Sequence, residues 1–474
     1  MNKSLITLAV AALISGCSLA PVYQRPAAPV AQQWPTGDAY KPASLDAETR
    51  AAAGIGWREF ISDDRLAQVV QLALDNNRDL RVSILNIEKA RSLHGAARAE
   101  RLPHLNAGVG QAAQRVPGKQ TPTGTATITR QYSGGLGIPA FELDFFGRIK
   151  NMSESALQQY LATQEARRAQ QISLVAEVAD AWLTLAADQE HLRLAEDTLK
   201  NQQITFELAK RRFESGATSG LDMYEAQTSA EAARNDAAIY RALVAAGVNR
   251  MTLLAGAEVP SGLLPQGSLQ QGSLQQVTRL ADLPAGVPST VLQQRPDVLE
   301  AERKLQAANA DIGAARAAFF PSISLTAFAG SASNELSGLF KAGSGTWNFS
   351  PQLNLPVFAG GANKANLELA RSSHSIALAQ YEKAIQSAFR EVADALAQRG
   401  TLDERVQSQT ALADAAEKSY RIHEARYQKG AESYLSALVS QRALYSAQHG
   451  LINTRLAKAS NQVTLYKVLG GGWK

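Results

Sequence analysis

The sequence predicts a protein of the α plus membrane-β class, in which long helices and membrane strands are built from two copies of one structural unit. Three observations predict this class: an internal repeat, two long stretches without proline, and short segments in which apolar and polar residues alternate. The chain has 474 residues, of which 45% are hydrophobic and 19% charged, with 34 Gly and 17 Pro. This composition excludes a disordered or collagen-like chain.

The N-terminus has the features of a bacterial lipoprotein signal. Lys3 supplies the positive charge, residues 5–14 form an apolar run of signal-peptide length, and Ile-Ser-Gly-Cys at 14–17 resembles a lipobox. The resemblance implies cleavage before Cys17 and a covalent lipid on that residue, N-palmitoyl and S-diacylglycerol, while Ser18 favours sorting to the outer membrane. An ordinary signal peptide with an incidental cysteine is the alternative. The proline-rich stretch that follows is expected to form an extended tether, because proline fixes φ and lacks a backbone donor.

The internal repeat consists of ordered matches at two nearly constant offsets. Gly-Ala-Ala-Arg at 95–98 recurs at 313–316, and Glu-Val-Ala-Asp-Ala at 177–181 recurs at 391–395. Self-similarity at a fixed spacing indicates a repeated supersecondary unit. The predicted divisions are a signal peptide (1–16), a lipidated N-terminal tether (17–60), a first structural repeat (61–259), an inter-repeat linker or equatorial segment (260–288) and a second structural repeat (289–474).

Each repeat is predicted to run helix, strand, strand, long helix, helix. No proline lies between Pro139 and Pro260 or after Pro356, and both stretches are rich in strong helix formers. A helix of about 68 residues is roughly 100 Å long. An ordinary two-stranded coiled coil is the alternative packing for such helices. The expected first helices cover 77–101 and 297–319, the long helices cover 148–215 and 362–429, and alternating strand patterns begin near residues 105, 132, 322 and 346.

The strands predict an assembly of several copies. No run of 18 or more apolar residues follows Cys17, so a membrane crossing is expected to use strands. Four strands cannot close a membrane barrel, and unpaired backbone groups in lipid cost several kcal/mol each, so we expect strands to be pooled between subunits. Two, three or four copies would give eight, twelve or sixteen strands, and twelve or more leave a lumen. A barrel with a lumen that continues into a long helical tube is a conduit.

Other classes of protein are disfavoured by the composition and by the motifs. The formal net charge is +5 and the charges are dispersed, so no nucleic-acid footprint is present. One cysteine cannot form an intramolecular disulfide or a thiolate cluster. The six histidines show no metal-binding spacing, and no phosphate-binding loop or nucleophile elbow is present. We therefore expect no enzymatic activity, no catalytic residue, no metal and no cofactor.

Four motifs resemble one known family. They are Gly-Trp-Arg-Glu-Phe at 56–60, Phe-Glu-Leu-Asp-Phe-Phe-Gly-Arg at 141–148, the segment 308–321 that ends in Phe-Phe-Pro, and Leu-Gly-Gly-Gly-Trp at 469–473. The chain resembles the TolC superfamily, specifically the lipidated OprM-type outer-membrane factors of resistance-nodulation-division (RND) multidrug efflux systems.

The resemblance implies a homotrimer with a twelve-stranded β-barrel in outer-membrane lipid, continued by a twelve-helix periplasmic α-barrel. It also implies two partners, a periplasmic membrane-fusion adaptor and an inner-membrane RND pump, with drugs as substrates. In that family the periplasmic end is constricted just beyond the second helical hairpin, and the matching segment here is 434–442. Leu435 and Val439 share one helix face, and three copies of each would form apolar rings that exclude water and ions by dewetting. The family pattern has Asp where this chain has Val439.

Further residues are assigned by the same resemblance and by the repeat. Candidates for locking the gate are Tyr427, Arg442, Asp222 and Glu225. The hairpins around Arg212, Gly216, Arg426 and Gly430 are where the adaptor would dock. Plain helix packing or a solvated face is the alternative for each residue. For the whole chain, the alternatives are a non-conducting envelope-spanning lipoprotein and a channel for protein secretion.

Overall fold

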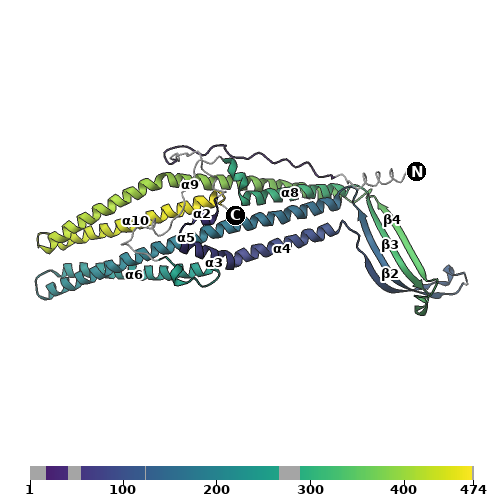
Figure 1. Ribbon diagram of the computed structural model, residues 1–474, viewed down its shortest axis with the longest axis horizontal. Coiled ribbons are helices and arrows are strands. Elements are labelled where there is room, and N and C mark those ends of the chain that lie inside the picture. Colours follow the sequence, from purple (N-terminus) through teal and green to yellow (C-terminus); the bar gives the residue numbers. More distant parts are fainter. Residues whose placement is uncertain (1–17, 41–54, 123, 266–288, 472–474) are drawn as a thin grey trace. The chain divides into compact units, whose positions relative to one another are not determined.

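The computed structural model describes residues 18–40, 55–122, 124–265 and 289–471. Its elements form two successions of helix, two strands and two long helices (Figure 1). None of the helices in these ranges is both long and apolar enough to cross a bilayer. The elements are α2 (Trp57–Phe60), α3 (Asp64–Asn76), α4 (Arg78–Ala99), β1 (Asn106–Val116), η2 (Gly118–Gln120), β2 (Thr127–Leu143), α5 (Arg148–Glu214), α6 (Gly220–Ala255), η3 (Ser261–Leu263), η5 (Ser289–Gln294), α8 (Pro296–Ala317), β3 (Ser322–Ser333), η6 (Leu336–Gly338), β4 (Gly345–Asn354), α9 (Ala362–Gln428) and α10 (Tyr434–Val468).

The structure confirms the predicted duplication. α5 and α9 each contain 67 residues and end within one residue of the predicted limits. The short helix α3 was not predicted. It begins where Asp63 caps it, because the Asp63 carboxylate accepts hydrogen bonds from the amides of Arg65 and Leu66 at 2.9 and 3.1 Å. The signal peptide, Cys17 and most of the predicted linker lie outside the described residues.

Two compact units divide the chain, and the division passes through α4, α5, α8 and α9. The first unit contains the sheet and the helical segments next to it in the sequence. The second unit contains the two helical hairpins, α5–α6 and α9–α10. The first comprises Met1–Ala27, Asn86–Thr163 and Glu300–Tyr381, and the second comprises Ala28–Leu85, Gln164–Leu299 and Glu382–Lys474.

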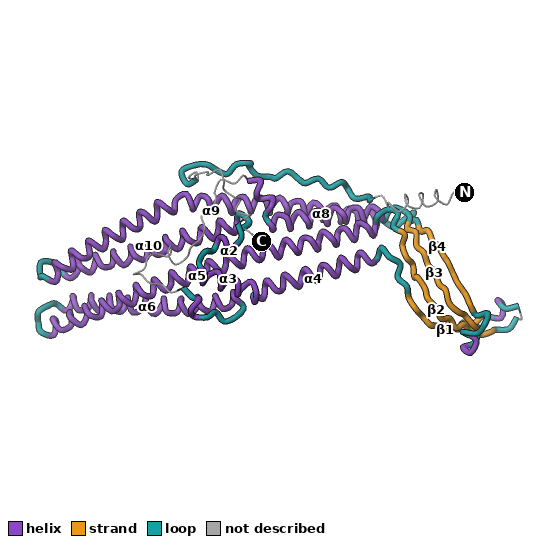
Figure 2. Tube along the Cα trace, viewed as in Figure 1, coloured by secondary structure: helices purple, strands orange, loops and turns teal. Residues whose placement is uncertain are grey.

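A four-stranded antiparallel sheet in the order β1-β2-β3-β4 dominates the first unit (Figure 2). Pairing of β2 with β3 joins the two repeats, and a β-bulge interrupts it near Ala140, whose φ is +43°. Large apolar side chains on the strands are exposed, for example Val109 and Trp347, both at 78%. Within the described residues, β1 and β4 each pair along one edge only. The opposite edges therefore present unpaired N–H and C=O groups.

The first residues after Cys17 bind to the face of α8. Arg25 forms a bidentate ion pair with the buried Glu302, with N···O distances of 2.7 and 2.6 Å. Closer to Cys17, Arg316 donates to the Leu19 carbonyl at 3.1 Å. The backbone of Ala20 lies so close to Gly313 that an added Cβ would come within 2.8 Å of its Cα. The segment expected to be a tether is thus docked on the first unit over these residues.

The core of the second unit follows an apolar stripe of α5. Ile172, Val175, Ala179 and Trp182 are all at most 4% exposed. Trp182 also donates its indole N–H to the carbonyl of Leu263 at 3.2 Å. These residues are spaced by three and four positions, so they lie on one side of the helix and bury that side.

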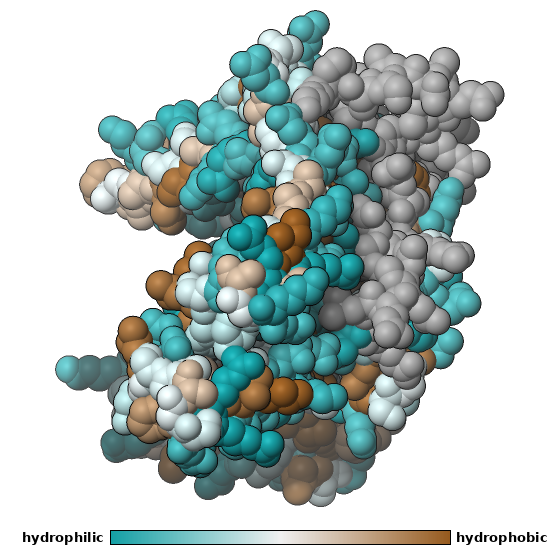
Figure 3. All heavy atoms as spheres, turned by 90° about the vertical axis from the view of Figure 1, so that its left-hand side faces the viewer, coloured by the Kyte–Doolittle hydropathy of each residue, from teal (hydrophilic) through white to brown (hydrophobic). Residues whose placement is uncertain are grey.

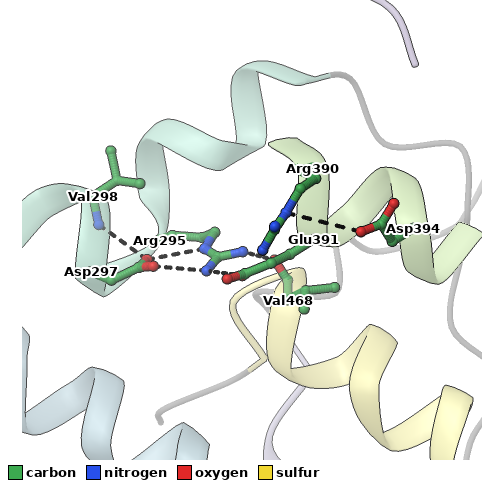
Figure 4. Close-up of polar contacts among 7 residues, drawn as sticks. All are labelled: Arg295, Asp297, Val298, Arg390, Glu391, Asp394 and Val468. Atoms are coloured by element: carbon green, nitrogen blue, oxygen red, sulfur yellow. Dashed lines mark hydrogen bonds and ion pairs between the residues drawn. The ribbon is translucent and has the colours of Figure 1, made fainter. Parts of the chain in front are cut away.

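At equivalent positions in the two repeats, a side chain from outside the last helix donates a hydrogen bond to a carbonyl at the C-terminal end of that helix. In the second repeat, the Arg295 guanidinium donates to the Val468 carbonyl at 2.7 Å and pairs with Asp297 and Glu391 at 2.7 and 2.9 Å (Figure 4). In the first repeat, the Asn77 side chain donates to the carbonyl of Leu254 at 2.9 Å. Each of these hydrogen bonds gives a partner to a carbonyl at a helix C-terminus, which has none inside its own helix.

Candidate functional site

The two hairpin turns that the sequence assigned to docking have nearly the same geometry. Gly216 and Gly430 have φ of +75° and +72°, the left-handed region that favours glycine. In each turn the glycine amide donates to the carbonyl three residues earlier, and the next amide donates to the carbonyl five residues earlier, at 2.8–2.9 Å. Ser219 and Ser433 then cap the following helices, with φ of −74° at both. The two repeats therefore form the same turn, with glycine and serine at equivalent positions.

An apolar cluster packs the two hairpins against each other near these turns. Its members come from α5, α6, α9 and α10, so contacts between residues about 200 positions apart in the sequence hold the hairpin ends together. The Tyr434 ring lies 5.4 Å from the Tyr427 ring, centroid to centroid, at 53°. The cluster consists of Ala209, Ala226, Tyr434 and Leu438, with Phe206 and Tyr427 packed against it.

Polar contacts cross the same seam between the hairpins. Arg212 donates to the Tyr427 hydroxyl at 3.2 Å, and its guanidinium carbon lies 5.7 Å from the centroid of that ring. Arg442 donates to Ser229 Oγ at 3.2 Å. Among the described residues, Arg442 forms no ion pair with a carboxylate.

Tyr434 lies at the centre of this region, although the sequence did not single it out. It is 6% exposed, and within the described residues its hydroxyl has no hydrogen-bond partner. Burial, together with the neighbouring Tyr427, Glu225 and Asp222, raises the pKa of Tyr434 to about 12, while Arg442 opposes the shift. The structure thus gathers all four locking candidates around one phenol. A comparison of the two repeats could have identified Tyr434. It is aligned with Gly220, so only the second hairpin carries a side chain at this position.

The two gate candidates are exposed on the same hairpin. Leu435 is 51% exposed and Val439 is 58% exposed, so this chain alone does not bury them. Figure 3, which faces the hairpin ends, shows hydrophobic side chains distributed among hydrophilic ones. Leu221 and Tyr224 on the first hairpin are exposed by 66% and 62%. Exposed apolar residues at these ends are available for contacts with other chains.

The docking candidates Arg212 and Arg426 differ in their partners. Arg212 reaches the other hairpin, whereas Arg426 pairs with Glu432 of its own turn at 3.4 Å. His423 Nδ1 also lies 2.9 Å from a Glu432 oxygen, an arrangement that was not predicted. In the described part of the chain, no group of three His, Cys, Asp or Glu residues is arranged to hold a metal ion.

Comparisons with known proteins agree with this architecture. The family model "Outer membrane efflux protein" matches residues 69–257 and 287–471. A toluene efflux pump outer membrane protein of Pseudomonas putida, TtgC, is 49% identical over 475 residues, which cover 100% of this chain and 96% of the relative. Outer membrane protein OprJ of Pseudomonas aeruginosa is 41% identical over 466 residues, covering 98% and 95%.

Solved structures give the same result. The open state of the MtrE outer membrane channel of Neisseria gonorrhoeae superimposes with a TM-score of 0.84 at 35% identity, covering 97% of this chain and 99% of that chain. A membrane protein from Pseudomonas aeruginosa superimposes with a TM-score of 0.87 at 40% identity, covering 96% and 98%. The fold and the hairpin turns thus define a channel subunit of the TolC type. The chain belongs to the outer membrane efflux protein family, and it is a transport conduit of the outer membrane and not an enzyme.

Proposed function

We propose that three copies of this chain form one efflux duct, with a twelve-stranded barrel in the outer membrane and a twelve-helix tube in the periplasm. The observation that carries the proposal is the open four-stranded sheet, whose β1 and β4 edges are unpaired in the described chain. In lipid each open edge needs a partner, and β4 of one copy next to β1 of the next supplies it. Three copies give a barrel wide enough for a lumen. Each copy also contributes two helical hairpins to the tube.

The duct would conduct drugs and organic solvents passively from an inner-membrane RND pump and a periplasmic adaptor. The names of the relatives support this class of substrate, since they are toluene, solvent and antibiotic efflux proteins. The two hairpin turns would contact the adaptor, because their geometry is fixed and their apolar side chains are exposed. Leu435 and Val439 would form the apolar constriction of the closed duct.

A lipid on Cys17 would anchor the duct in the outer membrane. The lipobox supports this modification, as does the docking of the adjoining segment on the first unit through Leu19 and Arg25. The modification would consist of N-palmitoyl and S-diacylglycerol groups. Mass spectrometry of the mature N-terminal peptide tests it, since an unmodified Cys17 would contradict it.

Planar-bilayer recording tests the duct itself. Purified wild-type particles are expected to be trimeric and to conduct weakly, and a variant carrying Leu435→Ala with Val439→Ala is expected to conduct more strongly. Chromatography with light scattering gives the particle mass. A monomer, or a folded double variant that never conducts, would refute the duct and favour a closed spacer.

A further inference from the structure

A stack of imidazole and phenol rings joins the two hairpins at some distance from the turns; His191 is buried and the other three residues are half-buried. The rings of His191 on α5 and His449 on α10 are stacked, with centroids 4.4 Å apart and planes at 19°. Tyr240 of α6 stacks on His191 at 4.9 Å, and Tyr445 of α10 meets His449 edge-on at 4.4 Å. The stack therefore involves α5 and α6 of the first hairpin and α10 of the second.

The polar groups around the stack favour neutral imidazoles. His191 Nε2 lies 3.1 Å from Asn453 Oδ1, so the amide oxygen accepts a hydrogen bond from this nitrogen. His449 Nδ1 lies 3.4 Å from the Tyr240 hydroxyl. Within the described residues, the other nitrogens, His191 Nδ1 and His449 Nε2, are buried and have no hydrogen-bond partner. A protonated imidazole needs acceptors at both nitrogens, and these sites do not supply them.

Within the described residues, Asp236 and Asp188 are the charged groups that act on the rings of the stack. Asp236 of α6 accepts a hydrogen bond from the Tyr445 hydroxyl at 3.1 Å, and its charge favours protonation of His449. Burial raises the pKa of Tyr240, and the charges of Asp236 and of Asp188 on α5 raise it as well. Burial and the neighbouring His191 together lower the pKa of His449 to about 4, against the effect of Asp236; burial also lowers the pKa of His191. Burial and the paired imidazoles thus outweigh Asp236.

We propose that the His191–His449 stack is an acid-sensitive latch, which holds the two hairpins of one chain together when neutral and releases them when protonated. Two cations 4.4 Å apart at a partly buried contact between helices repel each other, and more water must enter the contact to solvate them. Separation of α10 from α5 and α6 would release that repulsion. Because α10 begins at Tyr434 and carries Leu435 and Val439, release of the latch would also widen the proposed constriction.

The pH range follows from the pKa values. A histidine whose pKa is lower in the latched state than in the open one favours the latch fully above its ordinary pKa, about 6.5. That contribution falls as the pH drops from 6.5 towards 4, because the open state binds the proton more readily. Release is therefore expected in mildly acidic solution.

Only one of the two pairs of positions related by the repeat carries two histidines. At the offset of 214 residues, Arg405 takes the place of His191 and Asn235 that of His449. Those residues cannot form an imidazole stack. In an assembly of several copies, the latch would lie within each chain and not between chains, so acid would open only the seams within chains.

Hydrogen exchange in detergent tests the latch without reference to conduction. Wild-type protein at pH 4.5 is expected to show at least tenfold lower protection of α10 amides near His449 than at pH 7, after correction for the intrinsic pH dependence of exchange. His449→Gln, which stays neutral, is expected to abolish this loss. His423→Gln, at a hairpin histidine outside the stack, serves as the control and is expected to keep it. Equal loss in wild type and His449→Gln would overturn the latch, as would no loss in wild type.

Conduction shows whether the latch acts on the gate, and this part rests on the proposed function. Open probability of the wild type is expected to rise at least threefold between pH 7 and pH 4.5, and His191→Asn or His449→Gln is expected to prevent the rise. If the variant carrying Leu435→Ala with Val439→Ala conducts at pH 7 but acid does not open the wild type, the latch is wrong and the duct stands. If acid loosens α10 in exchange but no variant conducts, the duct fails and the latch stands.

Discussion

Replacement of Arg295 by Ala should loosen the end of α10 more than any exposed substitution. The side chain is 9% exposed and contacts three partners, the Val468 carbonyl, Asp297 and Glu391. The two carboxylate side chains are 44% and 39% exposed, so water can solvate them after the change. The main cost is therefore the buried Val468 carbonyl left without a donor, about 1–3 kcal/mol. Loss of the buried side chain's packing adds about 1 kcal/mol.

The total, about 2–4 kcal/mol, corresponds to roughly 30- to 1,000-fold faster amide exchange. Hydrogen exchange of the last turn of α10 measures this change. Arg295→Lys keeps the positive charge but not the planar set of donors of the guanidinium. It should therefore recover part of the amide protection that Arg295→Ala loses. Arg371, whose ion pair with Glu368 is exposed on both sides, serves as the control, and its replacement by Ala should change exchange by less than about fivefold. Equal effects of the two Ala substitutions would refute the reasoning.

Four further predictions concern the hairpins and the anchor. Leu435→Ala with Val439→Ala should increase uptake of an antibiotic too large for other entry routes; unchanged uptake would contradict the gate assignment. Gly430→Ala should destabilise the second turn by about 1 kcal/mol, because its φ is +72°, and limited proteolysis should cut there sooner; unaltered cleavage would count against this. Tyr427→Phe removes a hydrogen bond worth about 0.5–1.5 kcal/mol, so the same proteolysis should show a modest effect, smaller than that of Tyr427→Ala. Cys17→Ser should abolish lipid labelling and lower the outer-membrane fraction, and full labelling of that variant would exclude Cys17 as the site.

Local signals allowed the ends of the long helices to be predicted. Gly430 ends α9 in the left-handed region, and the absence of proline after Pro356 leaves nothing to interrupt the helix before it. The alternation of residues before Pro356 likewise located β4. The helix α3 was missed because a single capping residue, Asp63, marks its start, and the residues before it give few other signals of a helix boundary.

The seam between the hairpins was beyond prediction for a different reason. Periodicity assigns residues to a face of one helix but does not identify the helix that packs on that face. The contact of Arg442 with Ser229, 213 positions earlier, could therefore not be derived from the sequence of α10. The contact of Arg212 with Tyr427 also depends on how two hairpins meet, and no local pattern in the chain specifies that meeting.

The duplication provides a control within one molecule, because each repeat shows what the fold alone requires of the other. The turn glycines and the capping serines occur in both repeats, so the hairpin architecture accounts for them. Among the many positions at which α10 differs from its counterpart α6, three concern residues discussed above: Tyr434 replaces a glycine, Val439 replaces a glutamate, and His449 replaces an asparagine. The fold does not require these residues, since α6 forms without them, and all three lie on the helix that carries the proposed constriction. Differences of this kind point to α10 as the helix on which the closing and opening of the duct depend.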